Sequence, residues 1–261
     1  MPLAYAADGA CVFWSEAAGA EVASHAGRAP TAVWLHGLGR DGAYFADAPR
    51  WLPAWRHVTV DLRGFSRSLL PSASSSSSSS SLQTWADDVA AVLAAACRAG
   101  ERVLLVGHSL GAAVAAQFAA SHPERVAALA LAAPSARVGP AAAARWAAAA
   151  AEAAARGDAG YAAAAQALAR GYDLRPALAT LRATPLLLLA GARDELTPPK
   201  AAEAVQRAAS SAEVTLCVVQ HAGHDALRDA PHARDELARW ARDVAEPAVL
   251  AASPGRIASR L

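Results

Sequence analysis

The segment RVLLVGHSLG combines one serine with two glycines in a pattern that can build a nucleophile. Gly107, Ser109 and Gly111 fit the pattern G-x-S-x-G and follow the apolar run Val103–Val106. The run predicts a buried strand, and the alanine-rich residues 110–120 predict a buried helix after it. A turn this tight strains the serine backbone and leaves no room for a side chain at either glycine. We therefore expect a sharp strand-to-helix turn that lifts the Ser109 hydroxyl out of a sheet.

A serine hydroxyl becomes nucleophilic when a base takes its proton, and histidine suits this role because its ordinary pKa is about 6.5. Of the eight histidines, His224 follows the last predicted strand and is our choice for the base, with His221 as its main competitor. Asp194 directly follows another predicted strand, and it could orient the imidazole or simply cap the helix that begins at Pro198. Four histidines are expected at the surface or at caps: His25, His57, His122 and His232.

The carbonyl that a serine attacks becomes an oxyanion, which needs hydrogen-bond donors already in place. One donor would be the amide N–H of Leu110, the residue after the serine. The other would follow the predicted strand Thr31–Leu35, and we assign it to the N–H of Leu38. His108 is expected to point away from the reactive face of Ser109. No metal or organic cofactor is predicted, because the His, Cys and carboxylate residues show no ligand spacing.

Strands and helices alternate along most of the chain, and we expect one domain over residues 1–261. This rhythm predicts an α/β fold with a mostly parallel sheet and helices on both faces. Ligands of such sheets bind beyond the carboxyl ends of the strands, where every candidate residue lies. Asp8-Gly9 predicts an N-terminal hairpin, and a helix is expected over Thr84–Cys97 with Thr84 as its N-cap.

Three segments are expected to lie outside this framework. Residues 139–171 are dense in alanine and predict a small helical cap over the sheet, with Trp146 as a candidate substrate-binding residue. The serine run predicts a flexible loop over residues 72–81, because it cannot bury apolar surface. Residues 247–261 are expected to form a loose C-terminal tail.

Composition bears on partners and location. The net charge of +1, without a basic block, argues against nucleic acid as a partner. No apolar run approaches the roughly 20 residues that span a membrane, so none is expected to do so. Ser259, Arg260 and Leu261 resemble the S-K-L import address and indicate a peroxisomal import receptor as partner. The expected location is peroxisomal if the source is eukaryotic, and cytoplasmic otherwise.

Four segments together resemble the α/β-hydrolase superfamily. They are HGLG at His36, DLRGFSRS at Asp61, GHSLG at Gly107, and GARDELTP at Gly191 followed by AGH at Ala222. The resemblance covers roughly residues 32–245 and implies an α/β-hydrolase fold with a cap over the active site. It implies Ser109, Asp194 and His224 as the catalytic triad, with Leu38 and Leu110 as oxyanion donors.

The same resemblance implies structural roles for Asp61 and Arg63 near the site. It departs from the family at Ser66, where glycine is usual. The serine at position 109 disfavours dehalogenases and epoxide hydrolases of this fold, which place an aspartate there.

The expected function is a serine hydrolase that cleaves a small or medium carboxylic ester, thioester or lactone through an acyl-enzyme on Ser109. The apolar lid favours a small-molecule substrate with an apolar group. The same triad would also serve a C–C bond hydrolase, a lyase or a perhydrolase, and fold alone does not separate these reactions. A non-catalytic small-molecule receptor of this fold is the remaining alternative.

Overall fold

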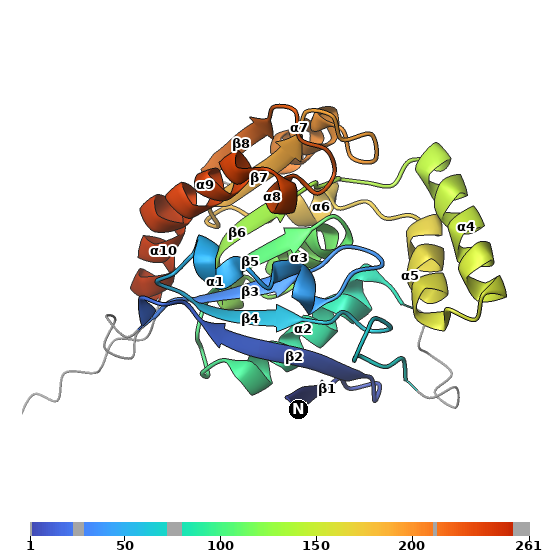
Figure 1. Cartoon of the computed structure of the whole chain (residues 1–261), viewed down its shortest axis with the longest axis horizontal. Helices are drawn as coiled ribbons and strands as arrows, with labels where there is room; N and C mark the ends of the chain where they lie inside the picture. Colours follow the sequence, from blue (N-terminus) through green and yellow to red (C-terminus); the bar gives the residue numbers. More distant parts are fainter. Residues whose placement is uncertain (1, 23–28, 72–79, 211–212, 253–261) are drawn as a thin grey trace, which may run out of the picture.

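An eight-stranded sheet forms the centre of the computed structural model, which describes residues 2–22, 29–71, 80–210 and 213–252 (Figure 1). Its strand order is β1-β2-β4-β3-β5-β6-β7-β8. The strands are β1 Leu3–Tyr5, β2 Cys11–Ala18, β3 Thr31–Leu35, β4 Arg56–Val60, β5 Val103–His108, β6 Val126–Ala132, β7 Leu186–Gly191 and β8 Val214–Val219. The six strands from β4 to β8 in this order are parallel, whereas β1 and β2 are antiparallel to their neighbours.

Helices cover both faces of this sheet (Figure 1). They are α1 Ala48–Trp51, α2 Leu82–Ala96, α3 Leu110–Ser121, α4 Pro140–Ala155, α5 Ala159–Ala169, α6 Arg175–Leu178, α7 Pro199–Ala208, α8 Ala226–Asp229, α9 Pro231–Trp240 and α10 Glu246–Ala252. One face buries Trp85 of α2 and Phe118 of α3, and the other buries Trp240 of α9. The predicted α/β fold with a mostly parallel sheet is confirmed. Among the described helices, none is both long and apolar enough to cross a bilayer.

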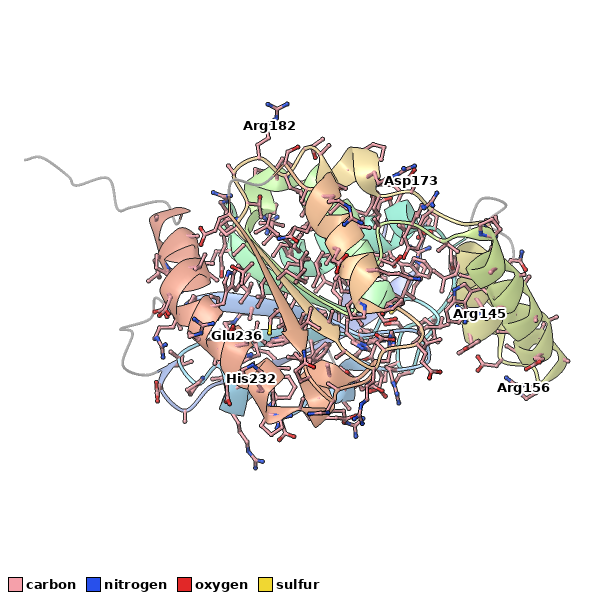
Figure 2. All side chains as sticks on the ribbon, turned by 90° about the horizontal axis from the view of Figure 1, so that it is seen from above. Arg145, Arg156, Asp173, Arg182, His232 and Glu236 are labelled. Atoms are coloured by element: carbon pink, nitrogen blue, oxygen red, sulfur yellow. The ribbon has the colours of Figure 1, made fainter. Side chains whose placement is uncertain are left out.

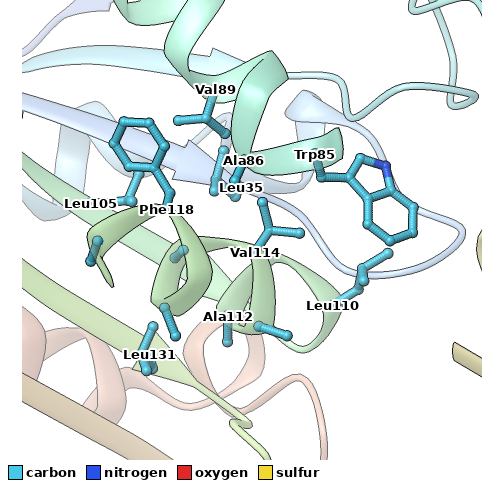
Figure 3. Packing of buried hydrophobic residues seen from close by; sticks show 14 of the residues in the cluster. Leu35, Trp85, Ala86, Val89, Leu105, Leu110, Ala112, Val114, Phe118 and Leu131 are labelled. Atoms are coloured by element: carbon cyan, nitrogen blue, oxygen red, sulfur yellow. The ribbon is translucent and has the colours of Figure 1, made fainter. Parts of the chain in front are cut away.

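The central strands carry the apolar runs that led to their prediction. Every residue of β5, β6 and β7 is buried, because helices shield both faces of the sheet there. Figure 3 shows Val114 and Phe118 of α3 packed among Leu35, Leu105 and Leu131 of the strands. Helix α3 is therefore held on nearly all sides, and the turn that precedes it is held with it.

Helices α4 and α5 form a hairpin beyond the carboxyl ends of the central strands (Figure 1). The chain leaves the body after β6 and returns before α6, and the two crossings are joined by a hydrogen bond from Leu174 N to Ala136 O at 2.8 Å. The start of α5 rests directly on the body at Gly160. A Cβ atom at this position would lie 1.7 Å from the carbonyl oxygen of Gly64, so only glycine fits this contact.

The prediction of a flexible loop over residues 72–81 is wrong at its last two positions, and the residues before Ser80 lie outside the described part of the chain. Ser80 is buried, and its carbonyl accepts a hydrogen bond from the Arg170 guanidinium. Ser81 is the N-cap of α2: its Oγ accepts from Thr84 N at 3.1 Å, and Thr84 Oγ1 accepts from Ser81 N at 2.7 Å. This reciprocal capping box moves the helix start forward, so Thr84 is not the N-cap.

The expectation of a loose tail over residues 247–261 is wrong for its first six residues. They belong to α10, in which Val249 is buried against the sheet. Pro247 is the second residue of this helix, where its missing N–H has no intrahelical acceptor to serve. Proline therefore permits the helix instead of ending it. The address residues lie outside the described part of the chain: Ser259, Arg260 and Leu261.

His57 is a core residue and not the surface or capping residue that we expected. It is fully buried, its Nδ1 accepts from Trp34 Nε1 at 3.1 Å, and its Nε2 donates to the carbonyl of Leu52 at 3.0 Å. Burial lowers the pKa of His57 to about 4, which keeps the ring neutral at pH 7. A histidine in a strand becomes such a core group when a neighbouring indole can satisfy it, which the chain order alone does not reveal.

The buried His57 predicts acid sensitivity. The unfolded chain binds a proton at the ordinary histidine pKa of about 6.5, but the folded chain does so only near pH 4. Because the unfolded state binds more protons in this window, the free energy of unfolding should fall as the pH drops from 6.5 to 4, by about 1.4 kcal/mol per pH unit for this residue. Urea titrations at pH 7, 6 and 5 should show a smaller pH slope in His57→Gln than in wild type. Equal slopes would contradict the assignment.

Arg63 ties three separate segments together. Its guanidinium is almost fully buried and donates to Asp88 of α2 at 2.7 and 2.6 Å. It also donates to Asp8, in the turn between β1 and β2, at 2.6 Å. The loop after β4 is thereby joined to the hairpin and to α2.

Replacing Arg63 by methionine should therefore destabilise the fold. The buried Asp88 would lose its cation, and breaking one side of a buried pair costs about 3–5 kcal/mol. Chemical denaturation of Arg63→Met should show this loss, and the double variant Arg63→Met/Asp88→Leu should recover part of it. A loss below about 1 kcal/mol in the single variant would contradict a structural role for Arg63.

Candidate active site

The turn between β5 and α3 holds Ser109 in a strained conformation, with φ 53° and ψ −112°. A Cβ atom at Gly107 would lie 2.3 Å from the carbonyl oxygen of Gly111, and one at Gly111 would lie 2.1 Å from that of Leu35. Both glycines are thus required by contacts with backbone, which cannot move aside. The sharp turn predicted from the sequence pattern is present.

Three side chains that are distant in sequence form one hydrogen-bonded chain. Nε2 of His224 lies 3.0 Å from the Oγ of Ser109, and its Nδ1 lies 2.8 Å from Oδ2 of Asp194. Ser109 follows β5, Asp194 follows β7, and His224 lies in the loop after β8, so all three lie at the carboxyl edge of the sheet. The arrangement allows the imidazole to take the serine proton while its other nitrogen donates to the carboxylate.

The carboxylate of Asp194 does both things that the sequence left open. Oδ1 accepts from the backbone N–H groups of Leu196 and Thr197 at 2.8 and 2.9 Å, which fixes the loop before α7. Oδ2 accepts from Thr197 Oγ1 at 2.7 Å and faces His224. Burial alone would raise the pKa of Asp194, but hydrogen bonds from His224 and Thr197 outweigh it and hold the pKa below its ordinary value. The group is therefore a carboxylate at neutral pH.

His221, the competing candidate base, is directed elsewhere. Its Nδ1 lies 3.1 Å from the guanidinium of Arg193, and its backbone has a positive φ of 63°. Thr197, by contrast, is a site residue that the sequence analysis missed. Its hydroxyl lies 3.3 Å from His224 Nδ1 as well as on Asp194, so it supports both groups.

His108 is a second missed residue, and it supports the loop that carries His224. Its Nε2 donates to the backbone carbonyl of His224 at 3.0 Å, and the two rings lie 5.1 Å apart. The ring also stacks on Tyr44, with centroids 4.8 Å apart. Burial lowers the pKa of His108 to about 4, so it stays a neutral donor. His108 thus links the turn at Ser109 to the loop of His224.

A cavity of about 80 Å³ lies over Ser109, between the body and the cap. Leu38 and Leu110 line it, and among the described residues no acceptor is bound by the amide N–H of either one. Both amides are therefore free to serve a ligand. Trp146 of α4 lines the cavity from the cap side, as does Tyr172. Within the described ranges, no cluster of His, Cys, Asp and Glu is arranged to hold a metal ion.

Comparisons with known proteins agree with this geometry. The model of a family described as serine aminopeptidase, S33, matches residues 29–157 and 156–231. The pimeloyl-[acyl-carrier protein] methyl ester esterase of Aeromonas hydrophila is 39% identical over 110 residues, which span 42% of this chain and 39% of that protein. The match thus covers well under half the length of this relative.

Solved structures of similar fold cover nearly the whole chain. A thermophilic esterase from Thermogutta terrifontis has a TM-score of 0.75 at 22% identity and covers 92% of this chain and 97% of its own. The enol-lactonase from Burkholderia xenovorans has a TM-score of 0.75 at 20% identity and covers 93% and 98%. At these identities the likeness shows the fold alone, whereas the family match spans most of the chain. The chain therefore belongs to the serine aminopeptidase S33 family of the α/β-hydrolase superfamily.

Proposed function

We propose that this protein is a serine hydrolase that cleaves a small carboxylic ester, thioester or lactone through an acyl-enzyme on Ser109. The observation that carries the proposal is the continuous hydrogen-bonded chain from Ser109 Oγ through both nitrogens of His224 to Asp194. A neutral imidazole between a hydroxyl and a carboxylate is the arrangement that activates an alcohol for attack.

In the first half of the reaction, His224 takes the proton of Ser109 while Oγ attacks the substrate carbonyl carbon. The carbonyl oxygen becomes an oxyanion, which the amide N–H groups of Leu38 and Leu110 would stabilise; losing one such donor typically costs about 3–4 kcal/mol. The protonated His224, steadied by Asp194, then donates its proton to the leaving alcohol or thiol. The products of this half are an acyl-enzyme and the released leaving group.

In the second half, a water molecule replaces the leaving group. His224 takes a proton from the water as its oxygen attacks the acyl carbon, and the same two amides hold the second oxyanion. Collapse of this intermediate returns the proton to Ser109 Oγ and releases the carboxylic acid.

The dimensions of the cavity favour a small substrate. A volume of about 80 Å³ corresponds to about six water-sized positions, so the enclosed part suits a group of about that many heavy atoms. Leu110, Trp146 and Leu168 give the enclosed part apolar walls. The esterase activity named for the Aeromonas relative agrees with this reaction class.

Labelling with a fluorophosphonate probe tests the proposal directly. Native protein should be labelled at Ser109, as located by peptide mass spectrometry, and a p-nitrophenyl ester should give a burst of nitrophenol from acyl-enzyme formation. Rates over a series from acetyl to decanoyl esters should be greatest for the short chains. Native protein that ignores the probe and all of these esters would instead support a non-catalytic receptor.

A further inference from the structure

The cap side of the cavity over Ser109 carries two positive charges. Arg137, just after β6, and Arg145 of α4 both line this cavity, and no Asp or Glu belongs to its described lining. The remaining walls are mostly apolar, and Trp146 and Leu110 are among them. A cavity lined in this way joins an apolar surface near the serine to guanidinium groups farther out.

Neither guanidinium is neutralised within the described residues. Arg145 forms no ion pair there, and no side-chain acceptor binds it. The acid that acts on Arg137 is Asp173, but its two carboxylate oxygens already receive a forked pair of hydrogen bonds from Arg175. Arg156, at the other end of α4, is by contrast paired with Glu152 at 3.9 Å.

Position on the cap separates these arginines further. Figure 2 shows Arg145 on the side of α4 nearer the body of the molecule and Arg156 near the outer end of the helix. Arg145 precedes Trp146, which lines the same cavity, whereas Arg156 does not line it. Arg156 is therefore a natural control for the general effect of positive charge on the cap.

A guanidinium binds a carboxylate with two parallel hydrogen bonds, and low-dielectric walls strengthen the attraction. We propose that the substrate is an anionic ester, whose small apolar part lies beside Leu110 and Trp146 and whose carboxylate is bound by Arg145 and Arg137. This inference rests on the proposed ester hydrolysis and adds the class of ester. The geometry of the cavity places the carboxylate within a few bonds of the scissile carbonyl.

Matched pairs of esters test the preference for charge. The pairs are monomethyl glutarate against dimethyl glutarate, and 3-acetoxypropanoate against its methyl ester. Wild-type kcat/KM should be at least 10-fold greater for the anionic member of one pair, and the pair that responds shows which side of the ester carries the charge. Raising the salt concentration to 1 M should reduce this ratio, because screening weakens an ion pair that is open to solvent.

Variants assign the preference to residues. Arg145→Gln and Arg137→Gln should each lower the anionic-to-neutral ratio about 10-fold, mainly through KM, whereas Arg156→Gln should leave it as in wild type. Arg145 and Arg137 are exposed, so neither substitution is expected to prevent folding. A wild-type ratio near 1 for both pairs, or equal effects of Arg145→Gln and Arg156→Gln, would overturn the anionic subsite and leave the proposed esterase in place.

A binding measurement separates this inference from the chemistry. Glutarate should bind to the Ser109→Ala variant in calorimetry, and Arg145→Gln in that background should weaken its binding about 10-fold. Such binding without ester turnover by wild type would support the subsite and reject the proposed reaction. Absence of glutarate binding, together with a ratio near 1, would reject the subsite.

Discussion

Replacing Ser109 by alanine should lower kcat for a p-nitrophenyl ester by at least about 10⁴-fold, since nothing else in the cavity can form the acyl-enzyme. The residual rate would come from the oxyanion donors and substrate binding alone. The fold should be retained, because the Oγ of Ser109 contacts only His224 among described hydrogen-bond partners and alanine fills the same space. Thermal denaturation should therefore give nearly the same midpoint for the variant as for wild type.

Ser121 offers a matched control at the opposite end of α3. Its hydroxyl bonds only to groups at that end of the helix, so Ser121→Ala should keep the wild-type rate. Fluorophosphonate labelling should disappear in Ser109→Ala and persist in Ser121→Ala. Retained ester turnover or labelling in a well-folded Ser109→Ala protein would remove Ser109 as the nucleophile.

Replacing His224 by alanine should have a similarly large effect, because the hydroxyl would lose the base that takes its proton. We expect a loss of about 10⁴-fold or more in kcat, with the protein still folded. The comparison variant is His221→Asn, in the same loop. Asparagine tolerates the positive φ of that position, and only the contact with Arg193 is lost, so a change of less than about 3-fold is expected.

Steady-state rates of the two histidine variants on the same ester decide between the candidate bases. Combining His224→Ala with Ser109→Ala should cost little more than either change alone, because the two groups act as one unit. If His221→Asn proved the more damaging change, the base would have to be reassigned to His221. Additive losses in the double variant would contradict a shared role for Ser109 and His224.

Local patterns in the sequence were sufficient for the framework of the site. The apolar run before Ser109 predicts β5, and parallel strands bring the loops of Asp194 and His224 to the same edge as the serine. Chain order and strand ends thus predict that these groups meet. The distances of 3.0 and 2.8 Å between them depend on side-chain packing across the sheet, which no local pattern contains.

The parts that sequence reasoning missed depend on contacts between distant segments. Ser80 looks like loop by composition, but Arg170 of the cap region binds its carbonyl. His108 supports His224 across 116 residues of chain, which only the closed fold reveals. Val249 anchors α10 because the sheet offers an apolar face there. Composition describes what a segment prefers alone, whereas each of these residues is ordered by a partner.

The contact between Gly160 and Gly64 also bears on how such an enzyme could change its diet over time. Two bare backbones touch there, so the height of the α4–α5 hairpin above the nucleophile is set by the thickness of the main chain itself. A single methyl group at position 160 would act as a wedge and lift the hairpin, widening the entrance for bulkier molecules. This scaffold can thus tune which compounds reach its serine through a position that none of them touches.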